Sequence, residues 1–196
     1  NNVKDILCGV TENDHYHLTE NGKKQIENLM PDLKNNNIDT IIHSPFIRTT
    51  ETADLVAKDL GLKTEKDDLL SEVKMGIAEG KSDGWVEKNI GNLETRLKTG
   101  WPNGENIDDL RQRAEKFLQE TENKYDNKKI LLVSHGDTIA ALRAVALGKT
   151  DLDAWRNNYP EIASVQKFSK FFQFKNQKYF DPHRPFIDEI ILKCNK

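Results

Sequence analysis

A histidine stands where a strand gives way to a helix, and such a position could bind a phosphate group. His135 follows the apolar run 130–133, which has the pattern of a strand buried on both faces. Residues 138–147 behind it form a helix-like segment that stops at Gly148. Because a helix N-terminus favours anions, His135 is placed to be a charged partner for phosphate. The alternative is a loop histidine with a local hydrogen bond.

An arginine follows a second strand in the same manner. The apolar run 38–42 leads through the turn Ser44-Pro45 into a segment with apolar residues at helical spacing, which ends at Gly61. Arg48 lies in the first turn of that helix, where a cation opposes the helix dipole unless an anion sits nearby. Arginine also binds phosphate oxygens in bidentate fashion. Taken alone, the residue could equally be a solvated surface arginine.

The elements that carry these residues alternate between strand and helix along the chain. Such connections give right-handed parallel crossovers, so we expect a three-layer α/β/α domain with a mainly parallel sheet. Ligands bind such sheets at the carboxyl ends of the strands, where both residues are expected. The expected helices are 19–35, 46–60, 83–97, a helix that begins after Asn106, and 138–147, and the expected extended segments are 38–43, 62–66 and 129–134.

Five short motifs follow one another along residues 1–148. They are His17–Gly22, Ser44–Ala53, Leu70–Glu72 with Gly76 and Glu79-Gly80, Pro102–Asn106, and Ser134–Gly136. In this order they resemble the histidine phosphatase superfamily, whose fold is phosphoglycerate-mutase-like. The resemblance implies hydrolysis of phosphate monoesters, or phosphoryl transfer, through a phosphohistidine intermediate. It also implies a phosphorylated small molecule as substrate and no cofactor or metal.

The resemblance further implies roles for individual residues. Arg48 and His135 would hold phosphoryl oxygens, and Asn2 would donate a hydrogen bond to another. Glu72 would donate a proton to the leaving group, which requires a raised pKa so that its carboxyl group stays protonated near neutral pH. An anion beside His135 is expected to raise the pKa of its imidazole. The segment 67–105, here called the lid, would cover the site and set the substrate.

The sequence departs from the family at its most reactive residue. The family opens with a strand that ends in Arg-His-Gly, whose histidine becomes phosphorylated, and no such triplet occurs among the 196 residues. We expect an N-terminal truncation that leaves the chain as given inactive. The reason is that loss of an interior strand would severely destabilise a parallel sheet. The alternative is a pseudoenzyme that has lost this strand.

The C-terminal residues carry a second resemblance. Asp181 and the run His183–Asp188 are similar to a segment of class I isoleucyl-tRNA synthetases that leads into a strand and a cysteine pair, although Pro182 replaces the usual leucine. Cys194 would be the first cysteine of that pair, which commonly holds zinc. Such a parent would bind ATP, isoleucine and tRNA. We therefore expect a phosphatase-like domain over 1–148, a linker-like extension over 149–177 and a synthetase-like segment over 178–196.

Composition limits the function classes without choosing among them. With 29 basic and 32 acidic residues the net charge is −3, which gives no sign of a nucleic-acid-binding patch. Two isolated cysteines suit a reducing cytoplasm rather than a disulfide framework. No run of about 18 apolar residues occurs, so we expect no membrane span. The open functions are a phosphatase or mutase, a non-catalytic accessory domain of a synthetase, and aminoacylation of tRNA by that synthetase.

Overall fold

Strand and helix alternate along most of the chain, with bounds close to those predicted. The structure is a computed structural model that describes residues 7, 9, 16–157, 159–160, 163–169 and 188–193. The α-helices are α1 (Glu20–Lys34), α2 (Ile47–Leu60), α3 (Asp83–Asn89), α4 (Leu93–Thr99), α5 (Ile107–Lys124) and α6 (Gly136–Leu147). Shorter turns are the 3₁₀ helices η2 (Asp68–Leu70) and η3 (Gly76–Ala78) and the π-helix η4 (Asp153–Asn157). The strands are β1 (Thr40–His43), β2 (Thr64–Lys66), β3 (Ile130–Ser134), β4 (Val165–Ser169) and β5 (Asp188–Lys193).

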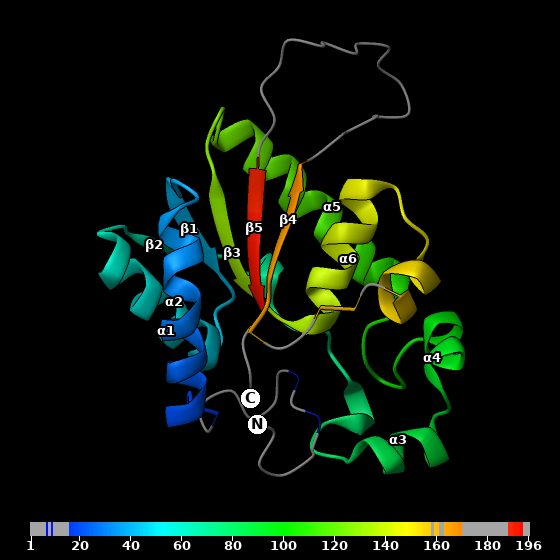
Figure 1. Ribbon diagram of the computed structural model, residues 1–196. Helices are drawn as coiled ribbons and strands as arrows, with labels where there is room; N and C mark the ends of the chain where they lie inside the picture. Colours follow the sequence, from blue (N-terminus) through cyan, green and yellow to red (C-terminus); the bar gives the residue numbers. More distant parts are fainter. Residues whose placement is uncertain are drawn as a thin grey trace, which may run out of the picture.

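One sheet runs through the centre of the molecule (Figure 1). Within the described residues it has five strands in the order β2-β1-β3-β5-β4. β1 pairs in parallel with β2 and β3, and β3 pairs in parallel with β5, whereas β4 runs antiparallel to β5 at the edge. The register places Ile42 opposite Leu132, and Leu132 opposite Ile191. A mainly parallel sheet is thereby confirmed.

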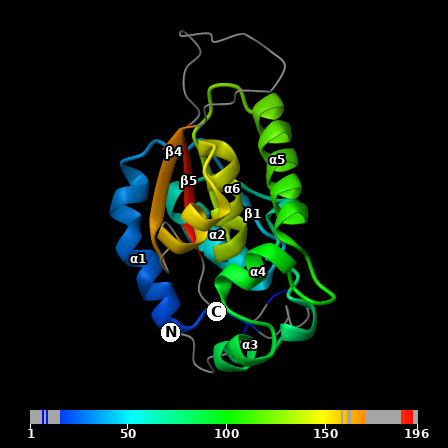
Figure 2. The same cartoon turned by 90° about the vertical axis from the view of Figure 1, so that its right-hand side faces the viewer.

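Helices cover both faces of the sheet, which gives the three layers expected from the sequence. Figures 1 and 2 show α1 and α2 on one face and α5 and α6 on the other. Consecutive strand residues alternate between two hydrophobic cores. Ile41, Leu131 and Val133 belong to the core beneath α1 and α2. Ile42 and Leu132 belong to the core beneath α5 and α6. These strands are apolar throughout because both of their faces are buried.

Local caps determine where several helices begin and end. Asn106 accepts a hydrogen bond from Asp109 N at 2.9 Å, and the Asp109 side chain accepts one from Asn106 N at 3.3 Å, a capping box at the start of α5. Thr19 caps α1 by accepting from Gly22 N at 3.0 Å. Gly61 follows α2 with a φ of 68°, a left-handed conformation that favours glycine. Such helix ends can be predicted from the sequence, because each capping residue is adjacent in sequence to the helix that it caps.

The single helix predicted over 83–97 is wrong, since two short helices occupy this part of the lid. Gly91 separates α3 from α4 with a φ of 120°, and a Cβ atom there would lie 2.9 Å from Thr95 Cβ. Asn92 then caps α4 by accepting from Thr95 N at 3.0 Å. A glycine backbone that other residues rarely adopt therefore interrupts the helix. Both lid helices lie past the carboxyl ends of β3 and β5 in Figure 1.

Both segments that follow α6 contribute strands to the same sheet. Residues 149–177 include η4 and β4, and residues 178–196 include β5. β5 lies between β3 and β4, so it has a partner strand on each side. The described parts of the expected linker-like extension and synthetase-like segment thus form strands of this sheet. The weak periodicity of residues 149–177 gave no signal for β4.

Candidate active site

Two helices begin directly after neighbouring strands, at the carboxyl edge of the sheet. α2 follows β1 with Phe46 at its N-cap, and α6 follows β3 with His135 at its N-cap. Arg48, in the first turn of α2, is 1% exposed, and His135 is 2% exposed. No acidic residue lies in that first turn of α2. Two helix N-termini and a buried arginine therefore create an environment that favours an anion.

Arg48 and His135 contact each other, and Ser44 orients the imidazole ring. Arg48 Nη2 lies 2.9 Å from His135 Nδ1, and His135 Nε2 lies 2.7 Å from Ser44 Oγ. Because a guanidinium group only donates, Nδ1 accepts, and the imidazole proton lies on Nε2, which donates it to the serine hydroxyl. This geometry corresponds to a neutral His135. A bound anion would favour the doubly protonated, charged form.

The Phe46 ring packs against both of these side chains. Its centroid lies 4.9 Å from that of His135, with 54° between the planes, and 4.9 Å from Arg48 Cζ. A cation over an aromatic ring is attracted more strongly when water is excluded. Thr49 Oγ1 donates to the carbonyl oxygens of Ser44 and Phe46 at 2.8 and 2.7 Å. These bonds fix the turn that carries the ring and the orienting serine.

The turn after η2 carries Glu72, whose side chain is buried at 6% exposure. Ser134 Oγ donates to Leu70 O at 2.8 Å. Thr138 Oγ1 donates to Ser71 O at 2.6 Å. These two hydroxyl groups flank the site histidine in the sequence. The segment that joins β3 to α6 therefore carries the histidine and also holds the backbone next to the buried carboxyl group.

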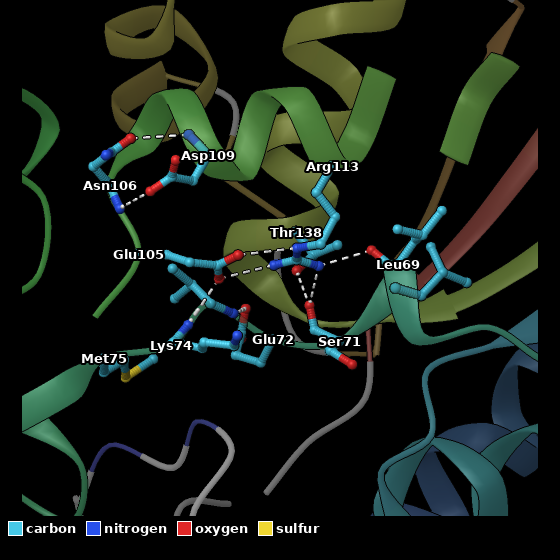
Figure 3. Close-up of polar contacts among 12 residues, drawn as sticks. Leu69, Ser71, Glu72, Lys74, Met75, Glu105, Asn106, Asp109, Arg113 and Thr138 are labelled. Carbon is cyan, nitrogen blue, oxygen red and sulfur yellow. Dashed lines mark hydrogen bonds and ion pairs between the residues drawn. The ribbon is translucent and has the colours of Figure 1, made fainter. Parts of the chain in front are cut away.

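The ion pair between Arg113 and Glu105 also contacts the turn that carries Glu72 (Figure 3). Arg113 Nε and Nη2 each lie 3.1 Å from a carboxylate oxygen of Glu105, which is a bidentate geometry. Arg113 Nη1 donates to Leu69 O and Ser71 O, both at 2.7 Å. Glu105 Oε2 accepts from Lys74 N at 2.9 Å. The backbone on both sides of the buried carboxyl group is thus held by polar contacts.

Residues from the sheet edge and from the lid line a cleft of about 590 Å³. Arg48 and His135 line it together with Glu72, Arg96 and Trp101 of the lid. Arg96 Cζ lies 5.3 Å from the centroid of the Trp101 ring. Apolar side chains and seven charged residues share its lining, namely Arg48, Glu72, Asp83, Glu87, Arg96, Glu105 and Asp137. A cleft of this size is typical of a site for a small molecule.

The structure brings together three of the residues expected from the sequence. Arg48, His135 and Glu72 line the same cleft. Asn2 and Cys194 lie outside the described residues. The catalytic and binding roles assigned to all five residues stay predictions.

Three contacting residues had no assigned role in the sequence-based prediction, namely Ser44, Phe46 and Arg113. The position of Ser44 is explained by strand register. Because His43 pairs with Val133, Ser44 lies level with Ser134 at the end of β3. No signal marks Arg113. Its carbonyl partners are 44 and 42 residues away in the sequence.

Metal and membrane sites were the other classes considered from the sequence. Among the described residues, no three His, Cys, Asp or Glu side chains are grouped so that they could hold a metal ion. In the same part of the chain, none of the helices has both the length and the apolar character that crossing a membrane requires.

Helix N-termini, a buried arginine and a histidine at the carboxyl edge of a parallel sheet are features typical of anion-binding α/β domains. The family model of the histidine phosphatase superfamily (branch 1) matches residues 1–171. The chain belongs to this family. The match continues past residue 148, where the sequence placed the end of the phosphatase-like domain.

Relatives of known name include a phosphatase and a probable mutase. Phosphoserine phosphatase 1 of Hydrogenobacter thermophilus is 28% identical over 185 residues, which cover 91% of this chain and 80% of that protein. The probable phosphoglycerate mutase GpmB of Escherichia coli is 29% identical over 143 residues, which cover 70% of this chain. The chain spans 65% of the mutase, which is just under two thirds of its length.

Solved structures confirm the expected histidine-phosphatase type of α/β fold. YhfR of Bacillus stearothermophilus has a TM-score of 0.76 at 21% identity, over 95% of this chain and 88% of that chain. The alpha-ribazole phosphatase from Shigella flexneri has a TM-score of 0.64 at 26% identity, over 79% of this chain and 77% of that chain.

Proposed function

We propose that the natural protein containing this chain hydrolyses phosphate monoesters, or transfers their phosphoryl group, through a phosphohistidine intermediate. The observation that carries the proposal is the buried contact between Arg48 and His135 on the same cleft as the buried carboxyl group of Glu72. Phosphoryl transfer needs donors at the phosphoryl oxygens and an acid at the leaving group. Membership of the histidine phosphatase superfamily supports the same chemistry.

The proposed reaction has two steps with one proton moving in each. First, a nucleophilic histidine nitrogen forms a bond to phosphorus, and the bond from phosphorus to the leaving oxygen breaks. Glu72 gives its proton to that oxygen, so a neutral alcohol departs. Second, water attacks phosphorus, the phosphorus–nitrogen bond breaks, and the Glu72 carboxylate takes a proton from the water. Arg48 and His135 donate hydrogen bonds to the phosphoryl oxygens in both steps. A mutase would use an alcohol in place of water.

The remaining components follow from the same scheme. Asn2 is proposed to donate to a further phosphoryl oxygen. Neither metal nor cofactor is assigned a step, because side chains supply the positive charge. The substrate is proposed to be a phosphorylated small molecule, which the cleft of about 590 Å³ can hold. Cysteine usage supports the cytoplasm as the location.

The test is an assay of the natural protein on p-nitrophenyl phosphate, with and without EDTA. We expect activity that EDTA does not change and that Arg48→Ala or His135→Ala lowers by at least about 100-fold, since each removes a donor to developing charge. The 196-residue chain alone is expected to be inactive, because it contains no Arg-His-Gly triplet. Activity that needs a metal, or that survives both substitutions, would contradict the proposal. A folded but inactive natural protein would favour an accessory ligand-binding domain.

A second candidate function is aminoacylation of tRNA with isoleucine by a protein of which this chain would be one part. It rests on Asp181 and the run His183–Asp188, whose pattern resembles a synthetase. Asp188 begins β5, and the residues before it in this motif lie outside the described part of the chain. The activity would use ATP and tRNA, and zinc held through Cys194 and a second cysteine. Isoleucine-dependent exchange of pyrophosphate into ATP by the natural protein tests it, and no exchange would contradict it.

A further inference from the structure

We propose that Arg113 is a positioning residue that holds the carboxyl group of Glu72 in place within the cleft. The inference rests on the proposed role of Glu72 as the proton donor. Arg113 is not one of the residues that line the cleft, whereas Glu72 and Glu105 are. Arg113 therefore acts through the backbone and through Glu105, without touching the substrate.

The first contact of Arg113 is with the backbone directly before Glu72. Nη1 donates to the carbonyl oxygens of Leu69 and Ser71, each at 2.7 Å. The Thr138 hydroxyl donates to the same Ser71 oxygen at 2.6 Å. The carbonyl group next to the proposed acid is therefore held by a guanidinium group and a hydroxyl group together. Figure 3 shows these groups converging on Ser71.

The second contact runs through Glu105 to the backbone after Glu72. Arg113 aligns both carboxylate oxygens of Glu105 at 3.1 Å. Glu105 Oε2 then accepts from Lys74 N at 2.9 Å, and Glu105 N donates to Lys74 O at 2.8 Å. One guanidinium group thus fixes the chain on both sides of the proposed acid. A lysine has no rigid fork of donors and cannot make this set of contacts.

Burial makes this ion pair different from the others in the described part of the chain. The Arg113 and Glu105 side chains are 15% and 14% exposed, the lowest values among those pairs. Solvent therefore screens the pair weakly, and its geometry is well defined. Arg111 lies on the same helix and pairs with Asp151, with side chains 33% and 31% exposed. Because its partner Asp151 lies outside the turn that carries Glu72, Arg111 provides a matched control.

The experiment measures how activity depends on the leaving group in the natural protein. The substrates are a series of ring-substituted phenyl phosphates, whose leaving phenolates differ in basicity but have similar shape. The variants are Glu72→Gln, Arg113→Met, Arg113→Lys and the control Arg111→Met. A general acid contributes about 10²–10⁴-fold to rate, and its loss matters most for strongly basic leaving groups. For each variant, log(kcat/KM) is plotted against the pKa of the leaving phenol.

The proposal predicts a steeper plot for Glu72→Gln and for both Arg113 variants. In these variants kcat/KM should fall at least about 10-fold on phenyl phosphate and less on p-nitrophenyl phosphate. Arg111→Met should keep the slope of the unmodified protein. The inhibition constant of inorganic phosphate should stay within about 3-fold in every variant, since Arg48 and His135 still bind the anion. An Arg113 variant with an unchanged slope, or with an equal loss on all substrates, overturns the positioning role.

The outcomes also separate this inference from the proposed function. If the unmodified protein lacks phosphatase activity, or Glu72→Gln leaves the slope unchanged, the assigned role of Glu72 fails, and the Arg113 inference fails with it. If Glu72→Gln steepens the slope and Arg113→Lys and Arg113→Met do not, only the positioning role fails. Because Arg113→Met leaves Glu105 buried without its arginine, Arg113→Lys provides the same test with the positive charge retained.

Discussion

In the absence of an anion, the hydrogen bonds of Arg48 and Ser44 determine which ring nitrogen of His135 carries the proton. Arg48 donates to His135 Nδ1, so the imidazole proton lies on Nε2 and points to Ser44 Oγ. A phosphoryl group held by both side chains would raise the pKa of the His135 imidazole and so favour binding of a second proton. Ser44 carries no charge, but it sets the direction of the ring in either state. The contribution of Ser44 can be measured separately from those of Arg48 and His135.

Replacing Ser44 with alanine removes the acceptor for His135 Nε2–H. We expect kcat on p-nitrophenyl phosphate to fall about 3- to 10-fold, the equivalent of one net hydrogen bond of roughly 0.5–1.5 kcal/mol. Thr49→Val is the control, because the Thr49 hydroxyl donates to Ser44 O and Phe46 O and lies in the same turn. The control should lower the free energy of unfolding and keep kcat. Equal losses of kcat in both variants would show that the turn as a whole matters, not the serine.

Residue types and spacing predicted part of this site for a physical reason. His135 directly follows β3, and Arg48 lies in the first turn of the helix after β1, so a short stretch of sequence places each of them at the sheet edge. Glu72 required the family resemblance, because its turn has no regular pattern. Arg113 could not be predicted, since its contacts depend on how α5 packs beside a turn that is remote in sequence.

Among the elements, the 3₁₀ turn η2 begins at a partly buried carboxylate. Asp67 Oδ1 accepts a hydrogen bond from Leu69 N at 2.8 Å. Burial raises the pKa of Asp67, the bond from Leu69 opposes this, and the nearby carboxylates of Glu120, Asp68 and Glu65 raise the pKa further. The charged form of this side chain is therefore less favourable in the folded chain than in the unfolded one.

The substitution Asp67→Asn should become more stabilising as the pH rises. A carboxyl group with a raised folded-state pKa contributes stability that is fully present below its unfolded pKa of about 3.9 and is lost as the pH passes the folded value. Asparagine keeps an acceptor for Leu69 N and never ionises. Urea unfolding from about pH 4 to about pH 7 should show the variant gaining stability relative to the unmodified chain. The exposed neighbour Asp68 provides the control Asp68→Asn, and a difference for Asp67→Asn that is independent of pH would contradict the prediction.

Most elements were predictable because their signals are local. The apolar runs of β1 and β3 and the cap at Asn106 each act within a few residues. The lid was less predictable, since Gly91 could have been tolerated inside one longer helix at a cost of about 1 kcal/mol. Its left-handed conformation is set by tertiary structure, and no pattern in the sequence specifies it.

In the whole molecule, a strand from the far end of the chain completes the sheet. β5 pairs with β3 from Glu189 to Lys193 and with β4 from Asp188 to Leu192. Residues 188–193 therefore supply an interior strand of the described sheet. Strand pairing between distant segments has no local signature, so the sequence indicated this strand only through a resemblance and did not predict its place in the sheet.

Proline at position 190 tests whether the sheet depends on β5. Ile190 lies opposite Leu131 of β3 and Lys167 of β4, so the strand has partners on both sides. Proline has no backbone N–H and is not accommodated in such a strand. We expect Ile190→Pro to lower the free energy of unfolding of the 196-residue chain by at least about 1–3 kcal/mol, the cost of a buried group left without its hydrogen bond. Urea unfolding measures this change.

Ile190→Val is the control, since it keeps the backbone donor, and its unfolding midpoint should stay close to that of the unmodified chain. Disruption of β5 would also leave β3 and β4 with unpaired edges, which promote association between chains. Light scattering at equal concentration should therefore rise for Ile190→Pro and not for Ile190→Val. If both variants unfold at the same urea concentration and neither associates, β5 contributes nothing to the sheet, and the fold is stable without this strand.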